Sequence, residues 1–255
     1  MTNLWTMRLS TCLIALCGAA LWACSGPEEG PCQTRTFENL PYLVCSFDTS
    51  REDVRLFLRD EAGVPFGQFD RLANHVASQG GNLVFAMNAG MYHEDRRPVG
   101  LYIEEGQAEM GLVRSAGPGN FGMLPNGVFW IEGGEVGVSE TLAFDERFKA
   151  APPRFATQSG PMLVIDGALH PALNPDGTSL RRRNGVGVSE DGRQVYFAIS
   201  DVPVNFHSFA RLFRDDLGTP NALYLDGAVS KVYVPALERS ETGLDMGPIV
   251  GVVRE

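Results

Sequence analysis

The sequence has few residues of the kinds that bind metals or nucleic acids. Its 255 residues include only four histidines and five cysteines, and 31 acidic residues outnumber 21 lysines and arginines. The net charge of −10 argues against a nucleic-acid-binding protein, because such a protein needs a basic surface to meet the phosphates. The histidines lack the spacing of metal ligands, so we expect no metal site; they are His75, His93, His170 and His207.

The common catalytic motifs are also absent. The sequence contains no G-x-S-x-G nucleophile elbow, no H-E-x-x-H zinc motif and no P-loop. Its aspartates and asparagines lack the spacing of an EF-hand, so we expect neither bound calcium nor a cofactor. These absences disfavour a zinc hydrolase.

What the sequence does contain is typical of a globular domain with many turns. Hydrophobic residues make up 44% of the chain and charged residues 20%, with 29 glycines and 16 prolines. No repeat, charge block or Ser/Pro-rich linker divides residues 32–255. We therefore predict one domain over that range.

Residues 1–23 are typical of a signal peptide. Arg8 supplies the positive start, residues 13–21 the apolar run, and small Ala23 precedes Cys24. The Leu-Trp-Ala-Cys end resembles the lipobox of bacterial lipoproteins, which implies lipidation at Cys24 and a tether over residues 24–31. Ordinary cleavage near Ala23 and an uncleaved anchor are the alternatives. We predict that the protein is exported and is a lipoprotein that is periplasmic or displayed on the outer membrane or cell surface.

Two cysteines remain in the predicted domain. Cys32 and Cys45 lie thirteen residues apart, and in an oxidising compartment they are best explained as one disulfide. The alternative is a pair of buried free thiols.

Apolar runs bounded by turn residues predict ten short strands and two helices. The strands are expected over residues 43–47, 54–58, 82–88, 101–104, 127–131, 136–138, 162–165, 186–188, 195–199 and 222–226. The helices are expected over residues 69–79 and 205–217. Because a helix precedes a buried strand, we predict an α/β fold of the mixed α+β kind: a single domain with a mixed sheet, several hairpins and flanking helices.

Three polar residues lie at or just after the ends of predicted strands, where α/β proteins often place catalytic side chains. They are Asn88, Asp201 and Asp226. The alternative is that Asn88 and Asp226 only form turns beside glycine.

Residues 181–183 are three consecutive arginines and form the one dense basic patch of the sequence. Such side chains either bind phosphate or form structural ion pairs.

Four segments, read in order, resemble the phosphodiester glycosidase domain family. They are Asn88-Ala-Gly-Met-Tyr92, Gln158-Ser-Gly-Pro-Met-Leu-Val164, Arg183-Asn-Gly-Val-Gly-Val188 and Asn221-Ala-Leu-Tyr-Leu-Asp-Gly-Ala-Val-Ser230. The resemblance covers about residues 43–253. This chain departs from the family pattern at Ala228 and Val229, which replace glycines, and at Val202-Pro203, which replaces a Gly-Arg pair.

The resemblance implies hydrolysis of a sugar-1-phosphodiester at the anomeric carbon. Its catalytic residues would be Asp226, as nucleophile or base, and secondly Asp201; Arg183 would hold the phosphate. Other substrate-binding positions are implied by the matched motifs, or in the case of His207 by its place beside Asp201: Asn88, Gly90, Gly160, Asn184, Gly227, Ser230 and His207.

We therefore predict an exported glycosidase, held at the membrane only by a lipid on Cys24, acting on a sugar-phosphodiester or envelope glycan. One alternative is a non-catalytic lipoprotein that binds a phosphosugar or peptidoglycan fragment. Another is a structural envelope protein without a ligand.

Overall fold

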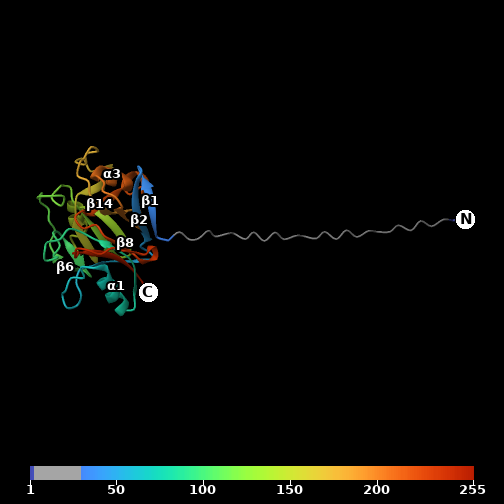
Figure 1. The fold of residues 1–255 in the computed structure, drawn as a ribbon, viewed down its shortest axis with the longest axis horizontal. Helices are drawn as coiled ribbons and strands as arrows, with labels where there is room; N and C mark the ends of the chain where they lie inside the picture. The colour runs from blue at the N-terminus through green and yellow to red at the C-terminus, as the bar shows by residue number, and fades with distance from the viewer. Residues whose placement is uncertain (3–29) are drawn as a thin grey trace.

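The structure is a computed structural model that describes residues 1–2 and 30–255 (Figure 1). All but the first two residues of the predicted signal peptide, together with Cys24 and most of the predicted tether, lie outside the described residues. Within the described part of the chain, no helix is long and apolar enough to cross a membrane.

The strands form three sheets in which all pairings are antiparallel. The first has the order β1 (Cys32–Phe37), β2 (Leu40–Asp48), β13 (Gln194–Ser200), β12 (Asn184–Val188), β14 (Asn221–Asp226), β10 (Met162–Ile165) and β11 (Ala168–Leu169). The second has the order β16 (Arg239–Ser240), β15 (Val232–Val234), β4 (Asn82–Asn88), β17 (Ile249–Arg254) and β3 (Asp53–Phe57). The third has the order β6 (Gln107–Met110), β5 (Tyr102–Glu104), β9 (Phe155–Ser159), β7 (Gly127–Glu132) and β8 (Glu135–Glu140).

The expected single mixed sheet is therefore corrected to three antiparallel sheets, although the mixed α+β class is confirmed. The helical crossover between β13 and β14 does connect two strands that run in the same direction. However, β12 lies between them and is antiparallel to both. A helix between two strands indicates that the two strands run in the same direction. It does not show that they are neighbours in the sheet.

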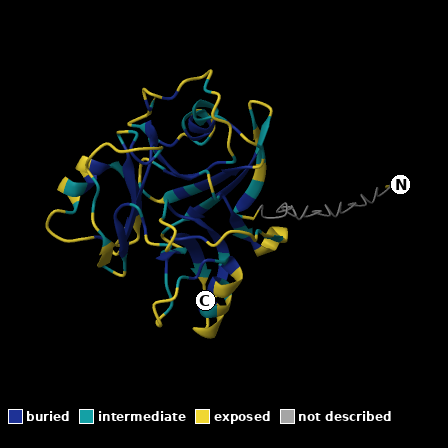
Figure 2. Ribbon diagram, turned by 60° about the vertical axis from the view of Figure 1, so that its left-hand side comes forward, coloured by how far each residue is buried: buried dark blue, intermediate teal, exposed yellow. Residues whose placement is uncertain are grey.

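One hydrophobic core unites the three sheets. Phe197 of the first sheet packs against Phe85 of the second, with ring centroids 5.0 Å apart, and against Phe129 of the third at 5.9 Å. Figure 2 shows the buried residues concentrated where the sheets face one another. This shared core confirms the prediction of a single domain.

Each sheet is also covered on its outer face by a helix. Helix α3 (Phe206–Arg211), which continues as a π-helical turn (Leu212–Asp216), packs on the first sheet. Helix α1 (Phe69–Ser78) covers the second sheet and α2 (Thr141–Arg147) the third. A short 3₁₀ turn (Pro235–Leu237) joins β15 to β16. The two predicted helices are confirmed as α1 and as α3 with its π-helical continuation.

The predicted disulfide is confirmed. Cys32 and Cys45 are directly opposite each other in the β1–β2 hairpin and are bonded. Glu38 and Asn39 form its turn with φ values of 51° and 60°, the left-handed backbone that a tight two-residue hairpin requires.

Candidate active site

The candidate site lies where the ends of β4, β12 and β14 meet. Fully buried Asn88 and Asn184 join the sheets, because Asn184 Nδ2 donates to Asn88 O at 2.9 Å and to Asn88 Oδ1 at 3.1 Å. Asn184 Oδ1 accepts from the Asp226 backbone N–H at 3.0 Å, and Asn88 Oδ1 accepts from Lys231 N–H at 2.9 Å. The two amides therefore use their polar atoms on the protein and fix the backbone of Asp226.

The Asp226 carboxyl group is held in a largely buried position. The residue is 7% exposed, and its Oδ1 accepts from the N–H groups of Gly227 at 2.5 Å and Ala228 at 2.8 Å. Burial raises the pKa of Asp226, while these backbone donors oppose the shift. Such a carboxyl group is suited to acid–base or nucleophilic chemistry, because its pKa lies closer to neutrality than that of an exposed aspartate.

A cavity of about 440 Å³ opens onto Asp226. It is lined by Met91, Tyr92, Val99, Pro118, Gly119, Asn120, Phe121, Asp226, Ala228 and Val229. Tyr92 is fixed by a hydrogen bond from its hydroxyl to Asp245 O at 2.9 Å, and burial together with the Asp226 charge raises the pKa of Tyr92 to about 12. The cavity thus combines one carboxyl group with neutral aromatic and aliphatic walls, a composition that suits a sugar ring.

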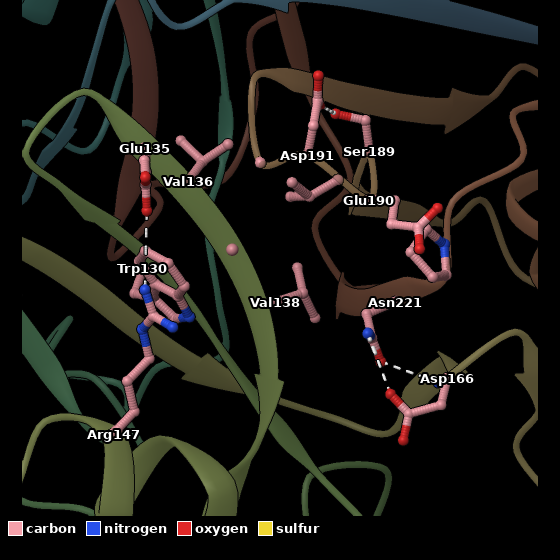
Figure 3. Close-up of a pocket in the computed structure, with 14 residues that line it drawn as sticks. Trp130, Glu135, Val136, Val138, Arg147, Asp166, Ser189, Glu190, Asp191 and Asn221 are labelled. Carbon is pink, nitrogen blue, oxygen red and sulfur yellow. Dashed lines mark hydrogen bonds and ion pairs between the residues drawn. The ribbon is translucent and has the colours of Figure 1, made fainter.

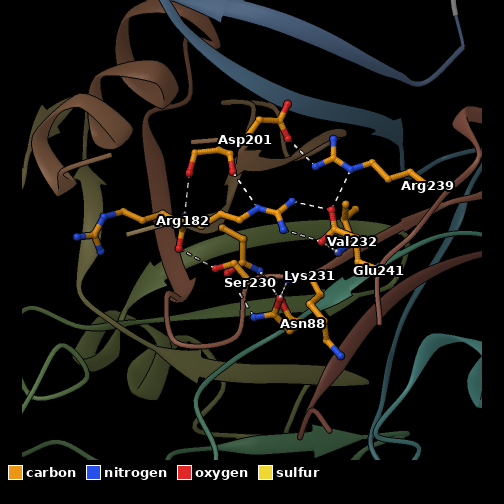
Figure 4. A network of polar contacts seen from close by, with 11 residues as sticks. Asn88, Arg182, Asp201, Ser230, Lys231, Val232, Arg239 and Glu241 are labelled. Carbon is orange, nitrogen blue, oxygen red and sulfur yellow. Dashed lines mark hydrogen bonds and ion pairs between the residues drawn. The ribbon is translucent and has the colours of Figure 1, made fainter. Parts of the chain in front are cut away.

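The loop after Asp226 is anchored from behind by an ion-pair network, shown in Figure 4. Ser230 Oγ donates to Asp226 O at 2.9 Å and lies 3.0 Å from Arg182 O, a second acceptor. The Arg182 guanidinium forms two hydrogen bonds with Glu241, at 2.6 and 2.8 Å. Ser230 therefore positions the loop and does not face the cavity with a free hydroxyl.

Asp201, the second predicted catalytic carboxylate, belongs to this same network and does not line the cavity. It accepts from Arg239 Nη2 at 2.5 Å, and Arg239 also reaches Glu241 at 3.0 Å (Figure 4). The structure therefore places Asp201 and Asp226 in different surroundings.

Arg183 is fully buried behind the loop. Its Nε donates to Val204 O at 2.9 Å and its Nη2 to Ser179 O at 2.7 Å, while the guanidinium lies 3.5 Å from the centroid of the Phe206 ring. It does not line the Asp226 cavity. In this structure its guanidinium supports the protein, and direct contact with phosphate stays a prediction.

The predicted glycines make close contacts with the protein itself. A Cβ at Gly227 would lie 1.9 Å from the Tyr224 hydroxyl, and one at Gly160 would lie 2.7 Å from Asn126 Cβ. At Gly90 the Thr157 hydroxyl would be 3.0 Å away. Close packing thus explains all three, although none lines the cavity. His207 lies half-buried on α3, also away from it.

Phe121 and Asn120 line the cavity but were not predicted as site residues, and Tyr92 was named only as part of a motif. The Gly117-Pro-Gly119 segment could have indicated this part of the chain, because it is not a phosphate loop yet supplies part of the cavity wall. Within residues 30–255 no group of three His, Cys, Asp or Glu side chains is arranged to hold a metal ion.

A different cavity, of about 520 Å³, lies beside β8 and the turn at residues 189–192 (Figure 3). Arg147 covers the Trp130 ring at 4.4 Å, and the side chains of Asp166 and Asn221 pair with each other. None of the predicted site residues lines it. The smaller cavity at Asp226 is therefore the better candidate for the active site.

This arrangement agrees with the family comparison. The family model of phosphodiester glycosidases matches residues 81–245, and the chain belongs to that family. It is 38% identical to uncharacterized protein YigE of Escherichia coli K12 over 183 residues, which cover 72% of this chain and 70% of YigE. The resemblance noted in the sequence is thereby confirmed.

Two solved structures share the fold. The catalytic domain of zebrafish N-acetylglucosamine-1-phosphodiester α-N-acetylglucosaminidase, auto-inhibited by its pro-peptide, aligns with a TM-score of 0.60 at 15% identity, covering 87% of this chain and 81% of that domain. A hypothetical protein from Synechocystis aligns with a TM-score of 0.58 at 14% identity, covering 88% of this chain and 61% of that protein.

Proposed function

We propose that the protein hydrolyses a sugar-1-phosphodiester of the N-acetylglucosamine type at the anomeric carbon. Membership of the phosphodiester glycosidase family supports a hydrolase of this kind. The observation that carries the proposal is the buried Asp226 carboxyl group at the wall of a cavity with aromatic side chains.

One carboxylate is sufficient for this reaction. Asp226 either attacks the anomeric carbon or removes a proton from the water that attacks it, while the bond from that carbon to the phosphate oxygen breaks. The electron pair leaves with a phosphate monoester, which needs little protonation. Water supplies the hydroxyl group of the released sugar and the proton that balances the products.

A non-catalytic phosphosugar- or peptidoglycan-binding protein is the second candidate. Ala228 and Val229 line the cavity with apolar groups, and the Ala228 N–H is occupied by Asp226. Fewer backbone donors are then free for a transition-state phosphate, which favours retention of a ligand over its turnover.

The test compares the full-length wild-type protein with Asp226→Asn and with Asp201→Asn as the matched control. Sugar release from a panel of sugar-1-phosphodiesters is measured. We expect Asp226→Asn to lose at least about 100-fold in kcat and Asp201→Asn to stay close to the wild type. Loss only in Asp201→Asn would reverse the two assignments. Binding without turnover in all three proteins would favour the second candidate.

We also propose that the protein is exported and lipidated at Cys24. The charged start, apolar run and Ala23-Cys24 junction support this proposal. In cells fed a labelled fatty acid, we expect label on the wild-type protein and none on Cys24→Ser. Equal labelling of both would contradict it.

A further inference from the structure

An anionic ligand in the Asp226 cavity meets no cationic side chain among the described residues that line it. Two cations close to the loop after Asp226, Arg182 and Lys231, are engaged elsewhere. Arg182 is bonded to Glu241, and Lys231 Nζ donates to Leu244 O at 2.7 Å with Gln68 Oε1 at 3.3 Å. Since a phosphodiester and the Asp226 carboxylate repel each other, a cation is needed at the cavity rim.

Arg96 is placed to supply it. Residues 92–98 form a tight hairpin in which Tyr92 bridges to Pro98, and Arg96 N–H donates to His93 O at 2.8 Å. Its φ of 68° is the left-handed conformation that a long side chain rarely adopts, which marks a constrained position. The hairpin holds the Arg96 guanidinium 5.4 Å from the centroid of the Tyr92 ring.

Tyr92 connects Arg96 to the cavity. Tyr92 lines the cavity together with Asp226, and its ring centroid lies 5.4 Å from the Arg96 guanidinium. Burial and the charges of Asp226 and Asp245 raise the pKa of Tyr92, and the charge of Arg96 lowers it. The half-buried Arg96 side chain has no hydrogen bond or ion pair within residues 30–255, whereas adjacent Arg97 is bonded to Asp95 at 2.6 Å. The guanidinium donors of Arg96 are therefore available.

We propose that Arg96 is a specificity-determining residue that binds the phosphate group of the substrate from the rim of the Asp226 cavity. A planar guanidinium matches two phosphate oxygens, and contact with the ring face leaves its edge N–H groups directed outward. This inference rests on the proposed function for its substrate class. It assigns the phosphate contact to Arg96 in place of the buried Arg183.

The test uses the full-length protein and its Arg96→Gln and Arg97→Gln variants. Calorimetry compares the binding of N-acetylglucosamine-1-phosphate with that of N-acetylglucosamine. We expect the wild type and Arg97→Gln to prefer the phosphate ligand by about tenfold or more, and Arg96→Gln to lose that preference while binding the free sugar unchanged. Arg96→Lys should restore part of it.

The outcomes separate this inference from the proposed function. A preference that survives in Arg96→Gln, or one that is absent from the wild type, would overturn the inference. If only Arg96→Gln loses the preference for the phosphate ligand, the role of Arg96 is supported. If the wild type also turns over no phosphodiester, that result refutes the proposed hydrolysis but not the role of Arg96. Turnover with equal activity of all variants would support hydrolysis and refute the role of Arg96.

Discussion

Asp226 experiences two opposing influences in the folded protein. Burial disfavours its charged form, and the N–H groups of Gly227 and Ala228 favour it, with burial the larger effect on the pKa. Because the pKa in the folded state exceeds that in the unfolded state, the ionised carboxylate costs stability at neutral pH. The cost disappears at a pH below the ordinary pKa of aspartate, where both states are protonated.

We therefore expect Asp226→Asn to raise the Tm at neutral pH and the difference to narrow as the pH falls. The wild-type kcat should also fall as the pH drops through the raised pKa, since catalysis needs the ionised form. Thermal unfolding and rate profiles against pH measure both effects. A variant less stable than the wild type at neutral pH would show that the backbone donors outweigh burial.

Gly227 packs against the Tyr224 hydroxyl, which has no hydrogen-bond partner among the described residues. We expect Gly227→Ala to lose stability and sugar-releasing activity, because its Cβ would overlap that hydroxyl. Tyr224→Phe removes the overlapping atom and should restore much of both losses in the double variant. Chemical denaturation and sugar release are measured for the two single variants and the double variant. If the losses of the two single variants simply add in the double variant, this explanation is contradicted.

At the scale of elements, the β1–β2 hairpin depends on the bond between Cys32 and Cys45. In the chain-entropy description, closing a loop of this length stabilises the fold by about 3 kcal/mol. We expect the double Cys→Ser variant to lose about that much in chemical denaturation. A loss below about 1 kcal/mol would show that strand pairing alone holds the hairpin.

Apolar runs predicted most of the strands, although the apolar strands β15 and β17 were missed. Strand β9 was missed because it reads Phe-Ala-Thr-Gln-Ser, yet all five residues are buried. Tertiary hydrogen bonds make that burial possible: Thr157 donates to Ala89 O, Ser159 to Leu225 O, and the Gln158 side chain accepts from Leu101 N–H. No local pattern reveals such distant partners.

At the scale of the whole molecule, the Asn88–Asn184 pair joins the first and second sheets at the site. We expect Asn184→Ala to lower the free energy of unfolding by about 2–4 kcal/mol, because it leaves buried groups of Asn88 and Asp226 unpaired. Asn205, which caps α3 through Ser208 N–H, is a matched control. Asn205→Ala should cost about 1 kcal/mol. If both variants lose the same free energy of unfolding, Asn184 contributes no more to stability than an ordinary helix cap does.

The sequence by itself determined the α+β class, two of the three α-helices, most strands, the disulfide, the family and the candidate carboxylate Asp226. These follow from local periodicity, turn chemistry and ordered motifs, which depend on neighbours along the chain. Only the tertiary structure decided that the sheets are three and antiparallel, that Asp201 and Arg183 lie outside the cavity, and that Tyr92 and Phe121 form its wall. Strand neighbours and side-chain surroundings are set by contacts between residues far apart in the chain, and a local pattern carries no record of those contacts.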